Sequence, residues 1–258
     1  MATIHFIDGE KGGVGKSLFA RVMVQYCLDK QLPYVLVEAD PSNPDVGVFY
    51  PENIQTAIFS ESERKVYAAD AIFNLALTTP VIVNLPAHVT RAVNDWIERN
   101  QILEMGTKHK VDICKWFVGN GGYDSVQLLI QSLNHFEGKI KHVFVRNFGL
   151  CDDWKHVDER EDLQELIQVQ KVPIINFPKF SYRERDLLDA TRINFSQAFL
   201  TAELGVLGQQ RLHSFLKKAY EEIGKAQVWN VGQPAANKLS LDIAYFGSPQ
   251  RNYCHNED

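Results

Sequence analysis

Lys11-Gly12-Gly13-Val14-Gly15-Lys16-Ser17 is the stretch that decides the fold of this chain. It follows a short apolar run, Thr3 to Ile7, and precedes a helix-length stretch, residues 17–29. A strand, a glycine-rich turn and a helix in that order are the setting of a phosphate-binding loop. Glycines let the main chain take positive φ angles and bring its N–H groups close to phosphate oxygens, and the helix N-terminus adds partial positive charge. The residues predicted to bind the phosphates are Gly12, Gly13, Val14, Gly15, Lys16, Ser17 and Leu18.

The loop departs from the strict Walker A pattern G-x4-G-K-[ST], because Glu10 stands where that pattern has its first glycine. The chain has instead the deviant Walker A form K-G-G-x-G-K-[ST], with an additional lysine, Lys11. In a phosphate loop, Lys16 can bridge the β- and γ-phosphates and the Ser17 hydroxyl can ligate Mg²⁺. We therefore expect the chain to bind ATP and Mg²⁺.

Strands and helices alternate along most of the chain. Continuous apolar runs rich in β-branched residues predict strands, and longer stretches with helical spacing predict helices between them. Alternating elements of this kind predict an α/β fold with a mostly parallel sheet and helices on both faces. The predicted strands are Thr3 to Ile7, Tyr34 to Val37, Pro80 to Leu85, Ile113 to Val118, His142 to Val145 and Pro173 to Phe177. The predicted helices are 17–29, 89–103, 124–136 (capped by Asp124 or Ser125), 158–169 and 195–223, the last broken around Gly205 or Gly208.

Two stretches interrupt this rhythm. Residues 41–79 mix proline, asparagine, serine and charge and contain no clear strand, which predicts an irregular insertion. Residues 226–258 are polar and rich in turn residues, which predicts a C-terminal tail. We therefore divide the chain into a P-loop domain, 1–225, and a tail, 226–258.

Composition excludes several classes of protein. Of the 258 residues, 45% are hydrophobic, which is enough for a core, and the net charge of −5 argues against a protein that coats nucleic acid. The sequence contains no run of about 18 apolar residues, so no membrane-spanning helix is predicted. Its N-terminus lacks the pattern of a signal peptide. The four cysteines are scattered without a CxxC pair, which disfavours a structural zinc site. We expect a cytoplasmic protein.

The motif KGGVGKS, followed by VEADPSNPDV at residues 37–46, resembles the ParA/MinD family of deviant-Walker ATPases. The resemblance implies that Lys11 reaches the phosphates of the nucleotide bound by a partner subunit, and that Asp40 orients the attacking water. It also implies that Asn147 contacts the adenine edge and that the loop containing Pro178 flanks the base. From the residues alone, the alternative for Asp40, before a proline, and for Asn147, before Phe148-Gly149, is a turn position.

The strand at residues 81–85 resembles the Walker B strand, which normally ends in aspartate. Here that position is Asn84. An amide can hold a Mg²⁺-bound water through its carbonyl oxygen but adds no negative charge. We expect Mg²⁺ at Ser17, with Asp40 and Asn84 acting through water, and slow hydrolysis.

The resemblance also implies partners: a homodimer formed on ATP binding and a protein activator. Residues 181–225 carry seven basic and six acidic side chains, which leaves non-specific DNA binding open. The tail does not resemble a membrane-binding amphipathic helix. Three interpretations follow: a ParA-like switch that positions DNA such as a plasmid, an ATPase accessory to plasmid conjugation or mobilisation similar to TraL, or a nucleotide-binding scaffold with little hydrolysis.

Overall fold

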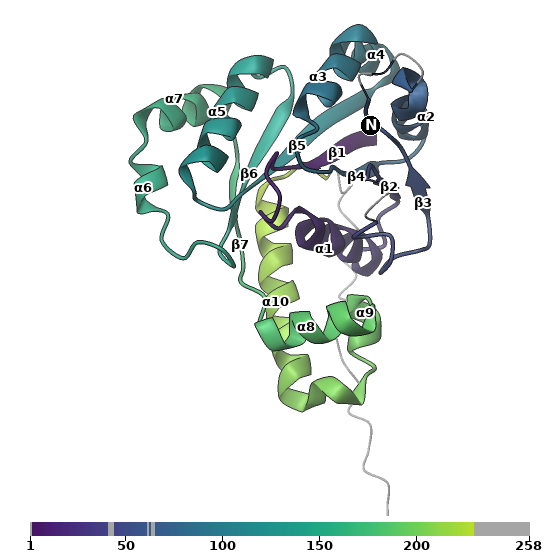
Figure 1. Ribbon diagram of the computed structural model, residues 1–258, viewed down its shortest axis with the longest axis vertical. Helices are drawn as coiled ribbons and strands as arrows, with labels where there is room; N and C mark the ends of the chain where they lie inside the picture. The colour runs from purple at the N-terminus through teal and green to yellow at the C-terminus, as the bar shows by residue number, and fades with distance from the viewer. Residues whose placement is uncertain (1, 41–43, 61, 63–64, 230–258) are drawn as a thin grey trace, which may run out of the picture.

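The computed structural model of the chain describes residues 2–40, 44–60, 62 and 65–229. It contains a seven-stranded sheet with the strand order β3-β2-β4-β1-β5-β6-β7, and every adjacent pair of strands is parallel (Figure 1). The strands are β1 (Ala2–Asp8), β2 (Val35–Glu38), β3 (Ile54–Thr56), β4 (Val81–Asn84), β5 (Val111–Gly119), β6 (Lys141–Asn147) and β7 (Ile174–Phe177). The predicted α/β class with a parallel sheet is confirmed.

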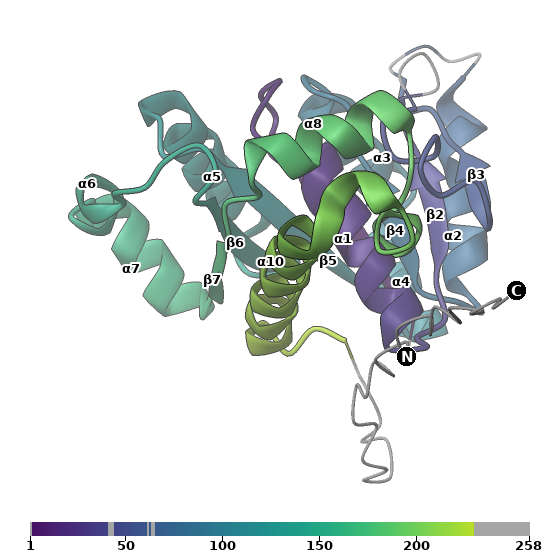
Figure 2. The same cartoon turned by 90° about the horizontal axis from the view of Figure 1, so that it is seen from below.

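Helices cover both faces of this sheet (Figures 1 and 2). On one face lie α1 (Lys16–Asp29), α8 (Tyr182–Thr191), α9 (Phe195–Ala198), the short 3₁₀ turn η2 (Ala202–Leu204) and α10 (Gly205–Lys225). On the other lie the 3₁₀ turn η1 (Val66–Ala69), α2 (Asp70–Ala76), α3 (Thr90–Arg99), α4 (Ile102–His109), α5 (Tyr123–Phe136), α6 (Lys155–Asp158) and α7 (Glu161–Gln170).

The central strand β1 shows why both faces are filled. Successive side chains of a strand point to opposite faces. Ile4 and Phe6 therefore join the core under α2 and α3, whereas Ile7 joins the core under α1 and α10. All three side chains are fully buried. A central strand that is apolar on both faces is what a parallel sheet between two helical layers requires.

The expectation that residues 41–79 contain no strand is wrong. Ile54–Thr56 forms β3, which pairs with β2 from Leu36 to Glu38 at the edge of the sheet. No apolar run marks this strand in the sequence. Its residues Gln55 and Thr56 are polar, and both are exposed. Backbone pairing with β2, rather than burial, makes the segment a strand.

Helix boundaries also differ from the prediction. The stretch 89–103 is two helices, because Gln101 between α3 and α4 has a left-handed φ of 49°. Helix α8 was not predicted, since five of its ten residues are charged and hide the helical spacing. The last predicted helix, 195–223, is interrupted before Gly205, which has a φ of 60° and begins α10. Gly208 lies inside α10.

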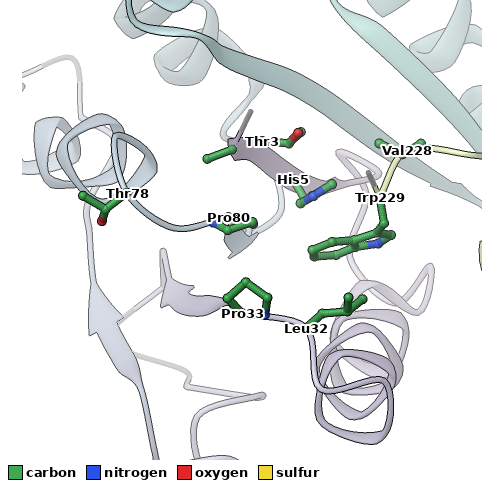
Figure 3. A pocket seen from close by; sticks show the side chains of 9 residues that line it. Thr3, His5, Leu32, Pro33, Thr78, Pro80, Val228 and Trp229 are labelled. Carbon is green, nitrogen blue, oxygen red and sulfur yellow. The ribbon is translucent and has the colours of Figure 1, made fainter. Parts of the chain in front are cut away.

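The folded part of the chain extends slightly beyond the predicted boundary at residue 225. Ala226 and Val228 are buried, and the Trp229 ring stacks on His5 with 4.1 Å between ring centroids (Figure 3). These contacts border a cavity of about 270 Å³ at the amino ends of the strands. The rest of the predicted tail, 230–258, lies outside the described residues. In the part of the chain that is described, no helix has the length and apolar character needed to cross a membrane.

A buried polar network lies under the carboxyl end of β1. The Asp8 carboxylate is 3.0 Å from the Lys115 ammonium of β5, and both side chains are at most 1% exposed. The other oxygen of Asp8 accepts the Gly9 N–H at 2.7 Å. Lys115 also donates to the Ser132 hydroxyl, which bonds to the ring of His142 at 2.9 Å. Burial raises the pKa of Asp8, but Lys115 and the N–H groups of Gly9 and Glu10 together hold it below the ordinary value. The carboxylate therefore stays charged and holds the first amide of the phosphate loop.

Two buried histidines make stability depend on pH. Burial lowers the pKa of His5 to about 3 and that of His142 to about 4. Below pH 6.5 the two histidines are therefore protonated in the unfolded chain but stay neutral in the folded chain. The free energy of unfolding decreases as the pH is lowered. We predict a loss of roughly 2 kcal/mol for each histidine between pH 6.5 and 5, measured by urea unfolding at each pH. His142→Gln should lose about half of this dependence, whereas the exposed His109→Gln should keep it; an equal slope in His142→Gln would contradict the prediction.

The Asp8–Lys115 pair gives a second prediction. Lys115→Met removes the cation and leaves a buried carboxylate without compensation, which should lower the free energy of unfolding by about 3–5 kcal/mol. The double variant Asp8→Asn/Lys115→Met should lose less than Lys115→Met alone, because no unpaired charge remains. Lys139→Met, which breaks an exposed pair with Glu137, is the matched control and should cost at most about 1 kcal/mol. A double variant less stable than Lys115→Met would refute the role of the pair.

Candidate functional site

The phosphate loop lies at the carboxyl end of β1, in the middle of the sheet, and leads into α1 (Figure 1). Gly13 and Gly15 have φ angles of 75° and 99°, which L side chains rarely adopt. A Cβ on Gly9 would approach the Val118 carbonyl to 2.6 Å, so the loop also needs glycine there for space. Phe19 N–H donates to the Gly15 carbonyl, and the earlier amides of the first turn of α1 have no backbone partner among the described residues, so they can bind a ligand.

Lys16 lies inside the curve of this loop. Its side chain is 8% exposed, and its ammonium donates to the Lys11 carbonyl at 2.9 Å. Burial lowers the pKa of Lys16, while the carboxylates of Asp8, Glu10 and Asp45 act in the opposite direction. A partly desolvated ammonium surrounded by free amides is suited to hold phosphate oxygens.

Glu10, the residue that breaks the strict Walker pattern, has a structural use. It takes a left-handed φ of 44°, as the glycine would. Its carboxylate accepts the Thr90 N–H at 3.1 Å and also the Thr90 hydroxyl, at the start of α3. Its carbonyl accepts the His88 N–H at 2.8 Å. Glu10 therefore ties the phosphate loop to the segment after β4. Sequence reasoning missed this role, although an acidic residue in place of a glycine was the available signal.

Ser17 and two acidic residues meet beside the loop. The Ser17 hydroxyl donates to Asp45 at 3.0 Å. Glu38, at the end of β2, is fully buried and accepts the Asn84 amide at 2.6 Å and the Val46 N–H at 3.0 Å. Burial raises the pKa of Glu38, and these hydrogen bonds act against that rise. Asp40 follows β2 and is half-buried, so Ser17, Asp40 and Asn84 all lie at the carboxyl end of the parallel strands.

These residues fit the Mg²⁺ ion that the sequence predicts. The Asn84 carbonyl oxygen is buried and has no hydrogen-bond partner among the described residues. The orientation of the amide is fixed chemically, because only its NH₂ group can face the Glu38 carboxylate. An oxygen of this kind, together with the Ser17 hydroxyl, matches the oxygen ligands and bound waters that Mg²⁺ prefers. The described residues contain no group of three or more His, Cys, Asp or Glu side chains arranged to hold a metal ion by themselves.

Lys11 points to a carboxylate of its own subunit. Its ammonium lies 2.7 Å from Asp124 in the first turn of α5. The prediction that Asp124 or Ser125 caps this helix is wrong, because the N-cap is Gly122 and no side chain bonds there. Ser125 instead accepts the Asn120 N–H at 3.4 Å. Both groups of the Lys11–Asp124 pair are well exposed, so the pair is weak and can exchange.

Asn147 supports the loop from the end of β6. Its amide donates to the Val14 carbonyl at 2.8 Å, and its carbonyl accepts the Gly149 N–H at 2.9 Å. Val14 itself is buried, and Leu18 packs against the same core. Pro178 is half-buried and directly follows β7. Asn147, predicted to contact the adenine edge, and Pro178, predicted to flank the base, therefore lie at neighbouring strand ends, and both roles stay predictions.

Two of the seven basic residues of the late helices form ion pairs with acidic neighbours. Arg211 is paired with Glu184, and Lys225 with Glu222. Lys217 is exposed, as is its neighbour Lys218 on α10. Arg183 and Arg192 are exposed as well, so these helices keep several exposed basic side chains and DNA binding stays a prediction.

Comparison with known proteins places this site in a wider context. No protein-family model matches the chain. The chain is 27% identical to Protein MobD of Acidithiobacillus ferrooxidans over 207 residues, which cover 79% of this chain and 89% of that protein. It is 24% identical to Protein TraL of Escherichia coli over 240 residues, covering 88% of this chain and all of TraL.

A solved structure has the same arrangement of elements. The MinC:MinD cell division protein complex of Aquifex aeolicus matches 87% of this chain and 96% of its own, with a TM-score of 0.50 and 12% sequence identity. At 12% identity, this structural similarity shows a shared fold and nothing further. The resemblance predicted from residues 11–17 is thus confirmed: the chain has the fold of the ParA/MinD P-loop proteins, and its sequence is related to MobD and TraL.

Proposed function

We propose that the chain is an ATP-dependent dimerising switch with slow Mg-ATP hydrolysis. The observation that carries the proposal is the phosphate loop of residues 9–17, with the buried Lys16 ammonium inside it. Asp40 is half-buried and lies, like the phosphate loop, at the carboxyl end of the parallel strands. A cationic cradle for phosphates beside a carboxylate that can order water is the machinery of a nucleoside triphosphatase.

Each residue has a separate task in this proposal. Lys16 and the free amides of the α1 first turn hold the phosphates, and Ser17 takes a place beside the Mg²⁺ ion. Asp40 positions the attacking water. Bound Mg²⁺ supplies charge neutralisation at the phosphates. Asn84 brings no negative charge to the end of β4, which is why we expect slow turnover that a partner protein stimulates.

Lys11 supplies the dimer-dependent part of the mechanism. In the single chain its ammonium is paired with Asp124, so it does not enter the loop of its own subunit. We propose that ATP brings two chains together and that Lys11 leaves Asp124 to contact the phosphates bound by the other chain. A cation delivered in trans stabilises charge that develops in the transition state.

The relatives in sequence favour one of the biological settings. Similarity to MobD and TraL over 89% and 100% of their lengths supports a role in plasmid transfer or mobilisation. A ParA-like role in positioning DNA would need a basic face, and on α10 two of the basic residues are already paired with acids. We therefore propose that a protein partner, rather than arbitrary DNA, receives the ATP signal.

Lys11→Ala separates binding from turnover. Because the Lys11 ammonium is directed to Asp124 and the substitution keeps the Lys11 main chain, the variant should bind ATP within about threefold of the parent. It should lose catalysis by about 10³-fold, the scale of a cationic finger. Equilibrium titration with a fluorescent ATP analogue and phosphate release under the same conditions measure the two quantities.

The control for this variant is Asp124→Asn, which removes the resting partner of Lys11 but keeps the lysine. Its turnover should be at least that of the parent, since the lysine is released earlier. ATP hydrolysis by Lys11→Ala at the parent rate would contradict the proposed mechanism.

A further inference from the structure

The hydrogen bond between Ser17 and Asp45 bears on how Mg²⁺ would be held. The Ser17 hydroxyl donates its proton to Asp45 Oδ2 at 3.0 Å. A hydroxyl that gives its only proton to a carboxylate keeps its oxygen lone pairs free for a cation. The bond therefore orients Ser17 as a metal ligand and adds a negative charge in the second coordination sphere.

Asp40 lies at the same end of the sheet but is assigned to the attacking water, and neither Asn84 nor Glu38 can supply that charge. Asn84 is neutral, and its NH₂ group is used by Glu38. The Glu38 carboxylate accepts the Asn84 amide with one oxygen and the Val46 and Gly47 N–H groups with the other, at 3.0 and 3.3 Å. Glu38 is fully buried. Its bonds hold the backbone that follows Asp45, so Glu38 fixes the place of Asp45 instead of facing the metal.

We propose that Asp45, on the loop after β2, takes over the role of the aspartate that the Walker B strand lacks in this chain. Asp45 is a positioning residue: it accepts the Ser17 proton and contributes the charge that draws Mg²⁺ to the phosphates. The Asn84 carbonyl oxygen, buried and without a partner in the described part of the chain, holds a water of the ion. The inference rests on the proposed function, because the metal enters with the nucleotide.

The test measures metal dependence of binding rather than turnover. A fluorescent, non-hydrolysable ATP analogue is titrated into the parent and Asp45→Asn, first in EDTA and then at increasing MgCl₂. In EDTA the two affinities should agree within about twofold. The Mg²⁺ concentration that gives half of the metal-dependent gain in affinity should rise at least tenfold in Asp45→Asn, the usual effect of losing a partner of a metal ligand. Mn²⁺ in place of Mg²⁺, followed by electron paramagnetic resonance, gives a second readout of the same site.

Two further variants make the result specific. Glu52→Gln removes one charge from an exposed residue farther along the same connection and should leave the Mg²⁺ midpoint unchanged. In a Ser17→Ala background, adding Asp45→Asn should shift the midpoint clearly less than in the parent, because only the through-space effect of its charge remains.

The outcomes separate this inference from the proposed function. If the parent binds ATP and Asp45→Asn has the same Mg²⁺ midpoint as Glu52→Gln, the role of Asp45 is refuted and the ATPase proposal stands. If the shift is equally large in the Ser17→Ala background, Asp45 does not act through Ser17 and the inference is also wrong. A parent that binds no nucleotide in either condition would overturn both.

Discussion

The buried ion pair between Asp8 and Lys115 is the interaction on which the site depends. Its two charges lie inside the sheet, on neighbouring strands β1 and β5, where neither could remain without the other. Because the second oxygen of Asp8 holds the Gly9 amide, the position of the phosphate loop is set from the core. The loop therefore starts from a fixed point, and its glycines can adopt demanding φ angles without making the whole turn loose.

The carboxylates around the phosphate loop have different binding partners and therefore different roles. Three of them act on Lys16, and each has its own partner: Asp8 has Lys115, Glu10 has Thr90, and Asp45 has Ser17. The first two are engaged with the fold, one with the core and one with the start of α3. Asp45 instead accepts the hydroxyl of Ser17, the side chain that is predicted to meet the metal. This division explains how a site with several acids can still accept an anionic ligand together with a divalent cation.

Much of this arrangement could be predicted from the sequence, because it rests on patterns that repeat locally. The apolar runs located six of the seven strands, and KGGVGKS located the loop and α1. The edge strand β3 and the charged helix α8 carry no such pattern, since backbone pairing and a few buried contacts decide them. The partners of Glu10, Asp8 and Lys11 could not be predicted either: Thr90, Lys115 and Asp124 are about 80 to 113 residues away along the chain, and only the fold brings them together.

The central claim is that the Lys16 ammonium and the surrounding amides hold a nucleoside triphosphate. Isothermal titration calorimetry, with ATP added to the parent and to Lys16→Ala in the presence of Mg²⁺, tests it most directly. The parent should bind ATP, and Lys16→Ala should bind it about 100-fold more weakly, because a charge-assisted contact worth roughly 2–3 kcal/mol is lost. Unfolding by urea should confirm that the variant is folded. Equal ATP affinity in a folded Lys16→Ala, or no binding to the parent, would contradict the account.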